Sequence, residues 1–209
     1  SRNVVKANGQ LYFINNRQQL CKMSAVAPFH EDIEKKAHDI ICEDFIIDNK
    51  KIYVLSRWGD LLDLSTNRFT KLQLLMDLKD WCSLAKSGNC LLVSSWSKTR
   101  HENVFFMLDF DLQIIHSLIV SCASWNSPAM RLLPLATDSG HYVISSRAGR
   151  FVDLLAIVNN RLTLLDSVYA TAGLKCSEIL CIAQIETSIL LGLGGKIRKL
   201  ALKRPRARD

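Results

Sequence analysis

The sequence predicts an all-β protein, and two observations support that prediction. Short apolar segments separated by small polar turns recur along most of the 209 residues. Helical spacing, by contrast, is evident in one segment, residues 30–42. The composition, 48% hydrophobic and 22% charged, is that of a globular chain able to bury a sizeable core.

The clearest copy of the pattern spans residues 51–72. An apolar strand at 51–56 is followed by a turn at 57–60, a second strand at 61–64, a turn at 65–67 and a third strand at 68–72. Tyr53 and Leu55 share one period-2 phase, and Ile52 and Val54 share the other. Apolar residues in both phases predict a strand covered on both faces by neighbouring sheets.

Other copies repeat this order with turns of different length. They occupy residues 4–21, 90–118, 141–165 and 188–200, and the glycines Gly9, Gly59, Gly149 and Gly195 are spaced by 50, 90 and 46 residues. A unit of about 45 residues with three or four strands is the size of a β-propeller blade. We therefore expect a β-propeller-like domain of four to five blades over residues 1–202, followed by a basic tail at 203–209.

The helical segment interrupts this repeat. Its sequence, HEDIEKKAHDIIC, places Ile33, Ala37 and Ile40 at helical spacing behind an acidic start. We expect an insertion over about residues 24–43, between the first two blades.

Residues 52–72 resemble the last three strands of the WD40 repeat. Ser56 to Asp60 stand at that repeat's Ser/Asp-Gly turn, Asp63 lies near the Asp of its Trp-Asp pair, and residues 65–67 stand at its Thr-Gly turn. Asp109 and Asp153 fall near the same place in other copies. The chain lacks the Trp-Asp dipeptide. The resemblance implies a propeller that serves as an interaction scaffold.

The length bears on closure of the ring. Seven blades need roughly 300 residues, and the copies at both ends of this chain are short. A ring need not close within 209 residues: the rest of a longer chain or a partner protein could complete it, or the ring is small and atypical. Open sheet edges invite pairing with another chain.

The net charge of +7 is concentrated at the C-terminal end. Residues 196–209 contain seven bases and one acid, a net of +6, so the other 195 residues total +1. The tail is typical of a nuclear-import or nucleic-acid-contacting segment, or of a solvated end or linker. The domain itself is nearly neutral, so the total charge does not make it a nucleic-acid binder.

The seven cysteines are odd in number, irregularly spaced and mostly in apolar runs. This favours reduced, buried thiols and a cytoplasmic or nuclear location. The chain contains no run of about 18 apolar residues, so the sequence does not predict a membrane-spanning helix.

Motifs for catalysis, metals or cofactors are weak. The segment Gly192 to Lys196 lacks the first glycine and the final Ser/Thr of a phosphate loop, and Ser95 to Lys98 matches a lactamase-type motif by spacing alone. The five histidines are scattered, and Cys176 with Cys181 lacks companion ligands. We predict a non-enzymatic protein without cofactor or metal.

The first turns of the copies are the candidate site. In a propeller, equivalent turns open on the same face of the ring, so their bases and tryptophans would gather there. Arginine offers a planar fork for carboxylate or phosphate, and tryptophan a large contact surface. The alternative is that these bases only keep exposed turns soluble. The residues are Arg57, Trp58, Trp96, Lys98, Arg100, Arg147 and Arg150.

These observations predict a non-catalytic scaffold or recognition module of a larger complex, which binds an acidic or phosphorylated peptide on one propeller face. A nucleic-acid- or chromatin-associated subunit that uses the tail and the same face is the alternative. An enzyme on a propeller scaffold is a third class, for which the sequence offers no motif.

Overall fold

The structure, a computed structural model, describes the chain in segments. These are residues 4–23, 30–32, 41–72, 80–97, 100–121, 129–135, 141–147, 151–169, 179–185, 188–193 and 196–201. Within them every extended element is a β-strand, and no helix is long and apolar enough to cross a bilayer.

The strands of these segments form five antiparallel sheets, each a simple meander, which we call blades 1 to 5. Blade 1 comprises β1 (Val4–Ala7), β2 (Gln10–Ile14), β3 (Leu20–Met23) and β4 (His30–Asp32). Blade 2 comprises β5 (Cys42–Asp48), β6 (Lys51–Ser56), β7 (Asp60–Asp63) and β8 (Arg68–Lys71). Blade 3 comprises β9 (Asp80–Ser87), β10 (Cys90–Ser97), β11 (Glu102–Leu108) and β12 (Ile114–Ser121). Blade 4 comprises β13 (Ala129–Leu135), β14 (His141–Arg147), β15 (Phe151–Val158) and β16 (Arg161–Tyr169). Blade 5 comprises β17 (Ile179–Ile185), β18 (Ser188–Leu193) and β19 (Lys196–Ala201).

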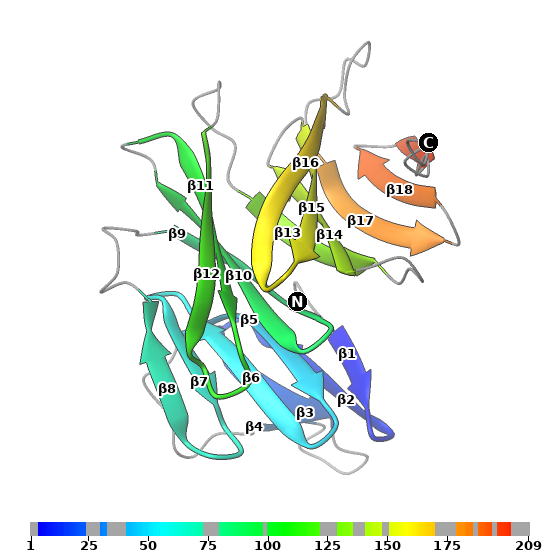
Figure 1. The fold of residues 1–209 in the computed structure, drawn as a ribbon. Coiled ribbons are helices and arrows are strands. Elements are labelled where there is room, and N and C mark those ends of the chain that lie inside the picture. The colour runs from blue at the N-terminus through cyan, green and yellow to red at the C-terminus, as the bar shows by residue number, and fades with distance from the viewer. Residues whose placement is uncertain are drawn as a thin grey trace.

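The blades follow one another around a ring, so the fold is a five-bladed β-propeller (Figure 1). The first strand of each blade is innermost: β1 packs against β5, β5 against β9, β9 against β13, and β13 against β17. The predicted all-β propeller of four to five blades is confirmed.

Strand β6 shows why the repeat folds this way. Tyr53 and Leu55 are buried in a cluster shared with blade 3. Val54, together with half-buried Ile52, packs in a cluster shared with blade 1. The two period-2 phases therefore cover the two faces of one sheet, as the sequence predicts, and each buried face stabilises a neighbouring blade.

The same arrangement joins the remaining consecutive blades. One cluster, which includes Leu92, Phe105 and Val143, lies between blades 3 and 4. Another, which includes Ile144 and Leu191, lies between blades 4 and 5. The hydrophobic core is thus a set of layers between sheets rather than one central mass.

A buried carboxylate also links the inner strands. Asp44 of β5 accepts hydrogen bonds from its neighbour Phe45 N (2.9 Å), from Leu84 N (2.7 Å) and from Ser83 Oγ (3.1 Å), the last two on β9. Ser83 Oγ in turn accepts a bond from Leu132 N of β13 (3.3 Å). Three blades are therefore connected through polar groups that burial makes costly to leave unpaired.

The predicted helix at residues 30–42 is wrong at both of its ends. His30–Asp32 forms β4, paired with β3, and Cys42 begins β5; residues 33–40 lie outside the described residues. Residues 30–32 form a strand because the edge of β3 is open to pairing. Blade 1 consequently has four strands, although the sequence pattern suggested a shortened one.

The phase of the first copy also differs from the prediction. The Asn8-Gly9 turn joins the first and second strands of blade 1, whereas the Gly59 turn joins the second and third strands of blade 2. Both are short turns with glycine at positive φ, +75° and +83°, so a glycine spacing alone does not separate them. The equivalent of the Gly59 turn in blade 1 is residues 15–19.

The buried cysteines agree with the expected thiol chemistry. Cys21, Cys42 and Cys90 carry thiols rather than disulfides. The first two donate hydrogen bonds to Gln19 O and Asp44 O, both at 3.6 Å. The other four cysteines are not tested, so their predicted reduced state stays a prediction.

Candidate functional site

The turns of a four-stranded meander lie alternately at its two ends, so the ring has two faces made of different turns. Turns between second and third strands lie on one face. We call it the arginine face after the exposed arginines in its described turns, and its candidate binding residues are Arg17, Arg57, Trp58 and Arg100. Turns between first and second strands, and between third and fourth strands, lie on what we call the opposite face.

The turn after β6 holds Arg57 and Trp58 in a defined conformation. Ser56 Oγ accepts hydrogen bonds from Trp58 N (3.2 Å) and Asp60 N (2.9 Å), and Gly59 N donates to Ser56 O (3.1 Å). A serine bonded to backbone groups two and four residues ahead fixes a tight turn. Trp58 nevertheless remains 56% exposed, so its indole is available for contact with a partner.

Blade 1 presents an equivalent turn that the sequence prediction missed. Asn15 Oδ1 accepts hydrogen bonds from Arg17 N and Gln19 N, both at 2.9 Å, and Gln18 N donates to Asn15 O (3.0 Å). This arrangement projects Arg17 into solvent. The signal in the sequence was the polar run at residues 15–19.

Backbone hydrogen bonds bring these two turns together. Cys42 N donates to Gln18 O (2.8 Å), and Arg57 N donates to Ile41 O (2.8 Å). The turns that carry Arg17 and Arg57, 40 residues apart in sequence, therefore lie on either side of the Ile41–Cys42 peptide. Two exposed guanidinium groups and an exposed indole are thus carried by neighbouring turns with fixed backbones.

Blade 3 adds Arg100, but not Trp96. Arg100 is exposed, and its N–H donates to Ser97 Oγ (3.3 Å). Trp96, expected in the turn, lies in β10 at 2% exposure, with its ring 6.3 Å from that of His101. Strand β10 pairs with β11 as far as Ser97, two residues beyond the predicted strand. Trp96 is therefore a core residue and offers no contact surface.

The remaining predicted site residues are less well defined. Arg147 ends β14, where its backbone pairs with Ala129. Lys98 and Arg150 lie outside the described residues. Their membership of the arginine face stays a prediction.

No described acid forms an ion pair with the arginines of the arginine face, Arg17, Arg57 and Arg100. Asp60 accepts a hydrogen bond from Ser56 Oγ (3.4 Å), and Glu102 is half-buried at the start of β11. Guanidinium groups without a carboxylate partner keep their capacity for bidentate binding.

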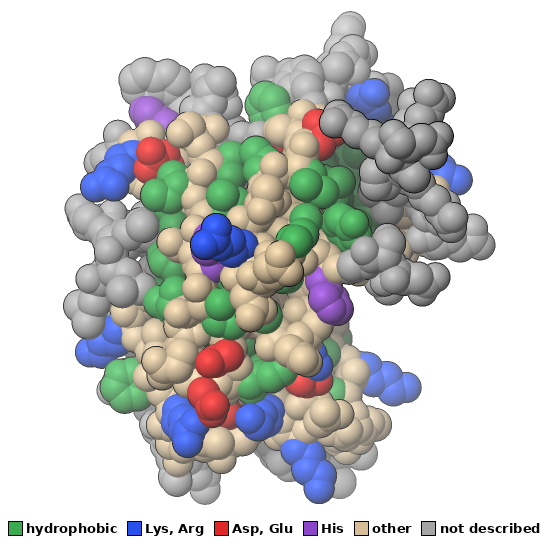
Figure 2. Space-filling view, viewed as in Figure 1, with side chains coloured by type: hydrophobic (Ala, Val, Ile, Leu, Met, Phe, Trp, Pro, Cys, Tyr) green, Lys and Arg blue, Asp and Glu red, His purple; other side chains and the backbone are tan. Residues whose placement is uncertain are grey.

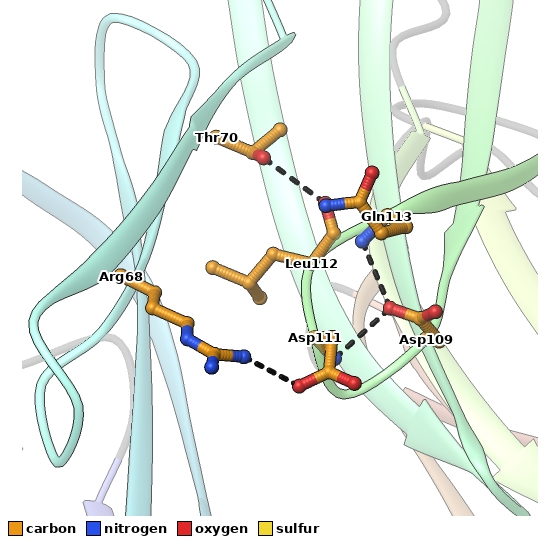
Figure 3. Close-up of polar contacts among 6 residues, drawn as sticks. All are labelled: Arg68, Thr70, Asp109, Asp111, Leu112 and Gln113. Carbon is orange, nitrogen blue, oxygen red and sulfur yellow. Dashed lines mark hydrogen bonds and ion pairs between the residues drawn. The ribbon is translucent and has the colours of Figure 1, made fainter.

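Two bases of the opposite face are paired with acids, whereas exposed Lys50 and Arg161 on the same face make no ion pair among the described residues. Arg68 of β8 forms a 2.6 Å ion pair with Asp111 in the turn of blade 3, and Thr70 Oγ1 donates to Leu112 O (3.0 Å) (Figure 3). Asp109 Oδ1 accepts from Asp111 N (2.9 Å) and Gln113 N (2.8 Å), which shapes that turn (Figure 3). Figure 2 shows acidic and basic side chains beside one another in the lower part of the view.

A second pair lies close by, at the edge of the core. Lys86 Nζ is 2.6 Å from Asp48 Oδ1 and 5.5 Å from the centre of the Phe110 ring. Tyr53 stacks on Phe110, with ring centroids 6.1 Å apart. Burial, together with the charges of Asp63, Asp48 and Asp111, raises the pKa of Tyr53 to about 12.

Two observations on the described side chains concern bond-making chemistry. Burial, and then the charge of Asp109, raises the pKa of the Cys90 thiol, which makes this thiol a poor nucleophile. Within the described segments, no three His, Cys, Asp or Glu side chains are grouped as metal ligands.

Comparison with known proteins supports the fold but does not assign a family. No protein-family model and no curated protein matches the sequence. The WD40 resemblance therefore stays a prediction.

Solved structures share the propeller. The computationally designed Ika8 protein matches with a TM-score of 0.64 over 95% of this chain at 12% identity, and the chain spans 57% of that protein's length. The designed Ika4 protein matches with a TM-score of 0.56 over 80% of this chain and 95% of its own, at 13% identity. KlAtg21, in complex with the coiled-coil of AgAtg16, matches with a TM-score of 0.58 over 92% of this chain and 63% of its own, at 15% identity.

Proposed function

We propose that this propeller is a non-catalytic protein-interaction module that binds an acidic or phosphorylated peptide on its arginine face. The observation that carries the proposal is the pairing of the Arg17 and Arg57 turns across the Ile41–Cys42 peptide, with exposed Trp58 in one of them. Propellers commonly serve as interaction scaffolds. The match to KlAtg21, whose structure contains a coiled-coil partner, supports protein partners in general.

The chemistry of the arginine face favours an anionic peptide over an apolar one. Each charge-assisted hydrogen bond contributes about 1.5–3 kcal/mol when well formed, and the backbone bonds that fix both turns reduce the entropy lost on binding. Trp58 can pack against the peptide backbone or an apolar residue beside the anion. We infer a reducing compartment, cytoplasmic or nuclear, because buried thiols persist there.

The proposal is tested with defined peptides. The probes are a fluorescent peptide of mixed sequence with a central phosphoserine, its unphosphorylated form, and a form with Lys in that place. We expect R57E and R17E each to weaken the phosphopeptide about tenfold, or about 1.4 kcal/mol, measured by fluorescence anisotropy. Weak, equal binding of all three peptides would contradict the proposal.

The matched control is R161E, which makes the same change of charge on the opposite face. Arg161 is exposed and follows the Asn159-Asn160 turn. R161E, like N67E and N160E in turns of the opposite face, should leave binding nearly unchanged. If R161E weakens the phosphopeptide as much as R57E does, the effect is one of total charge, and the site lies elsewhere.

The part of the prediction that rests on blade 4 needs its own variants. The double variant R147E/R150E should also lower phosphopeptide affinity about tenfold if these residues join the arginine face. Unchanged affinity in R147E/R150E with loss in R57E would restrict the site to blades 1 to 3.

Nucleic acid is the alternative partner, because the last fourteen residues carry a net charge of +6. Its signature is a steep linear fall of log affinity with log salt, through counterion release. A labelled single-stranded DNA that binds more tightly than the phosphopeptide, and whose binding is lost on removal of residues 203–209, would favour that alternative.

A further inference from the structure

The interior blades are covered on both faces, as their two-phase apolar strands require. On β10, Leu91 and Val93 pack toward blade 2, and Leu92 packs toward blade 4. Among the described residues, blade 1 packs one face on blade 2, and blade 5 packs one face on blade 4. Each therefore has a second face to account for.

The second face of blade 1 carries exposed apolar side chains. Val5, Tyr12 and Ile14 belong to the cluster with blade 2, so residues of the other phase point away from that blade. Register pairs Val4 with Phe13, and Phe13 with Cys21, on this other phase. Cys21 is buried, but three apolar residues of this face stay exposed: Val4 (62%), Leu11 (37%) and Met23 (50%).

The second face of blade 5 has the same character. Ile189 and Leu191 pack on blade 4, and the alternate residues of β17 to β19 point away from it. Among them, Ile185 is 55% exposed and Ile197 is 76% exposed. Register places Ile197 opposite Gly192, and Lys199 opposite half-buried Leu190, on this face.

These two faces border the same gap in the ring order, between blade 5 and blade 1 (Figure 1). We call it the seam, defined by Val4, Leu11 and Met23 on one side and Ile185 and Ile197 on the other. Among the described residues, no hydrophobic cluster joins blade 5 to blade 1, whereas one joins every other consecutive pair. Exposed isoleucine and leucine on two facing sheets mark a docking surface.

We propose that the seam binds a β-sheet segment of a partner protein. The side chains of this segment that face the seam are apolar, and those at its edges are acidic. A surface bounded by two sheet faces is best filled by another sheet, because sheets pack face to face about 10 Å apart. Register places Asp32 on the blade 1 face, opposite Cys21 at the β4 edge. The charged side chains whose exposure the structure describes on the two seam faces are those of Lys6 and Lys199, both exposed cations. An acidic partner complements them.

Charge also argues against a second copy of this chain as the occupant, because its seam would bring Lys6 and Lys199 against the same cations. The match to the designed Ika8 protein supports a segment that extends the ring. The alignment covers 95% of this chain but only 57% of the Ika8 protein. A longer propeller can therefore contain an arrangement like these five blades, which leaves room for a further sheet beside them.

The test uses a synthetic β-hairpin probe of about 16 residues, with alternating Ile/Val and Glu and a fluorescent label. A lone hairpin is marginally stable in water, so its binding should appear as a gain of β-structure as well as of anisotropy. We expect L11K and I197K each to weaken binding about tenfold, since both side chains are exposed and should be replaceable without unfolding. A hairpin with Lys in place of Glu should bind more weakly than the original.

Control variants make the outcome decisive. F69K removes an apolar side chain on β8 whose exposure, 60%, lies between those of Leu11 and Ile197. It should change hairpin affinity less than twofold, as should R57E on the arginine face. Hydrogen exchange should show protection at residues 10–14 and 196–201 on binding. The proposal is overturned if the hairpin does not bind, if F69K matches L11K, or if light scattering shows a homodimer that L11K dissolves. R57E is tested with the phosphopeptide and L11K with the hairpin. A negative result for the hairpin therefore does not affect the proposal for the arginine face.

Discussion

The two faces of the ring use the same kinds of turn residue to different effect. On the opposite face, Arg68 is paired with Asp111 and Lys86 with Asp48, each at 2.6 Å. On the arginine face, Arg17 and Arg57 have no described carboxylate partner, although their turns are as tightly hydrogen-bonded. Charge that is neutralised within the fold cannot serve a partner. The difference shows that exposed bases become candidate binding residues through their surroundings rather than their number.

The largest expected effect concerns the inner strands that hold the blades, and hence the arginine-face turns, in place. Asp44 is buried and accepts bonds from Leu84 N and Ser83 Oγ of the next blade. We expect D44A to lower the free energy of unfolding by about 3 kcal/mol, because it leaves buried donors unpaired. Denaturant unfolding measures this. D44N, which keeps an acceptor oxygen, should lose less; equal loss would assign the effect to charge alone.

The next effect concerns Tyr53, whose pKa is raised first by burial and then by nearby carboxylates of the opposite face. Its pKa is raised from 10.0 to about 12, so the folded state holds the phenolic proton more tightly than the unfolded chain. The stability from this group is complete below pH 10 and is lost as pH rises toward 12, on the order of 2 kcal/mol. Thermal unfolding across this range should show the loss.

Y53F is the control for that pH dependence. The Tyr53 hydroxyl is buried without a hydrogen-bond partner among the described residues, so its removal should leave stability at pH 7 unchanged or slightly raised. The fall in stability between pH 10 and 12 should become shallower. An unchanged slope in Y53F would show that other groups titrate there.

A smaller effect compares two glycine turns of the opposite face. Gly88 has φ of +57°, and a Cβ there would lie 2.9 Å from Cε1 of His141 in the next blade. Gly9 has φ of +75° with open space around it. Both G88A and G9A should cost about 1 kcal/mol of backbone strain, and G88A should cost more because His141 must move. If denaturant unfolding shows equal losses of unfolding free energy for the two variants, the His141 side chain moves aside at no measurable cost.

The smallest effect concerns the exposed ion pair of the opposite face. The Arg68 and Asp111 side chains are 61% and 71% exposed, so water and salt screen their attraction. We expect R68A and D111A, alone or together, to change the free energy of unfolding by less than about 0.5 kcal/mol. A coupling energy well above 1 kcal/mol in the double-mutant cycle would show that this pair helps to hold blades 2 and 3 together.

Sequence reasoning succeeded where local and tertiary signals agree. The apolar phases of residues 52–55 predicted a strand between two sheets, and the structure places Leu55 and Val54 on opposite clusters. It failed where the signal was local alone. The glycine at position 9 was assigned to the wrong turn, which hid Arg17, and Trp96 was placed in a turn although β10 extends through it.

What the sequence alone determined is the strand-and-turn repeat, the approximate number of blades and the concentration of charge at residues 196–209. These follow from side-chain period and turn chemistry, which act over a few residues. The tertiary structure decided which turns share a face, that β4 pairs at the edge of β3, and which arginines lack an acid nearby. Such features depend on the order of sheets around the ring and on hydrogen bonds such as Cys42 N to Gln18 O, between groups that sequence spacing does not bring together.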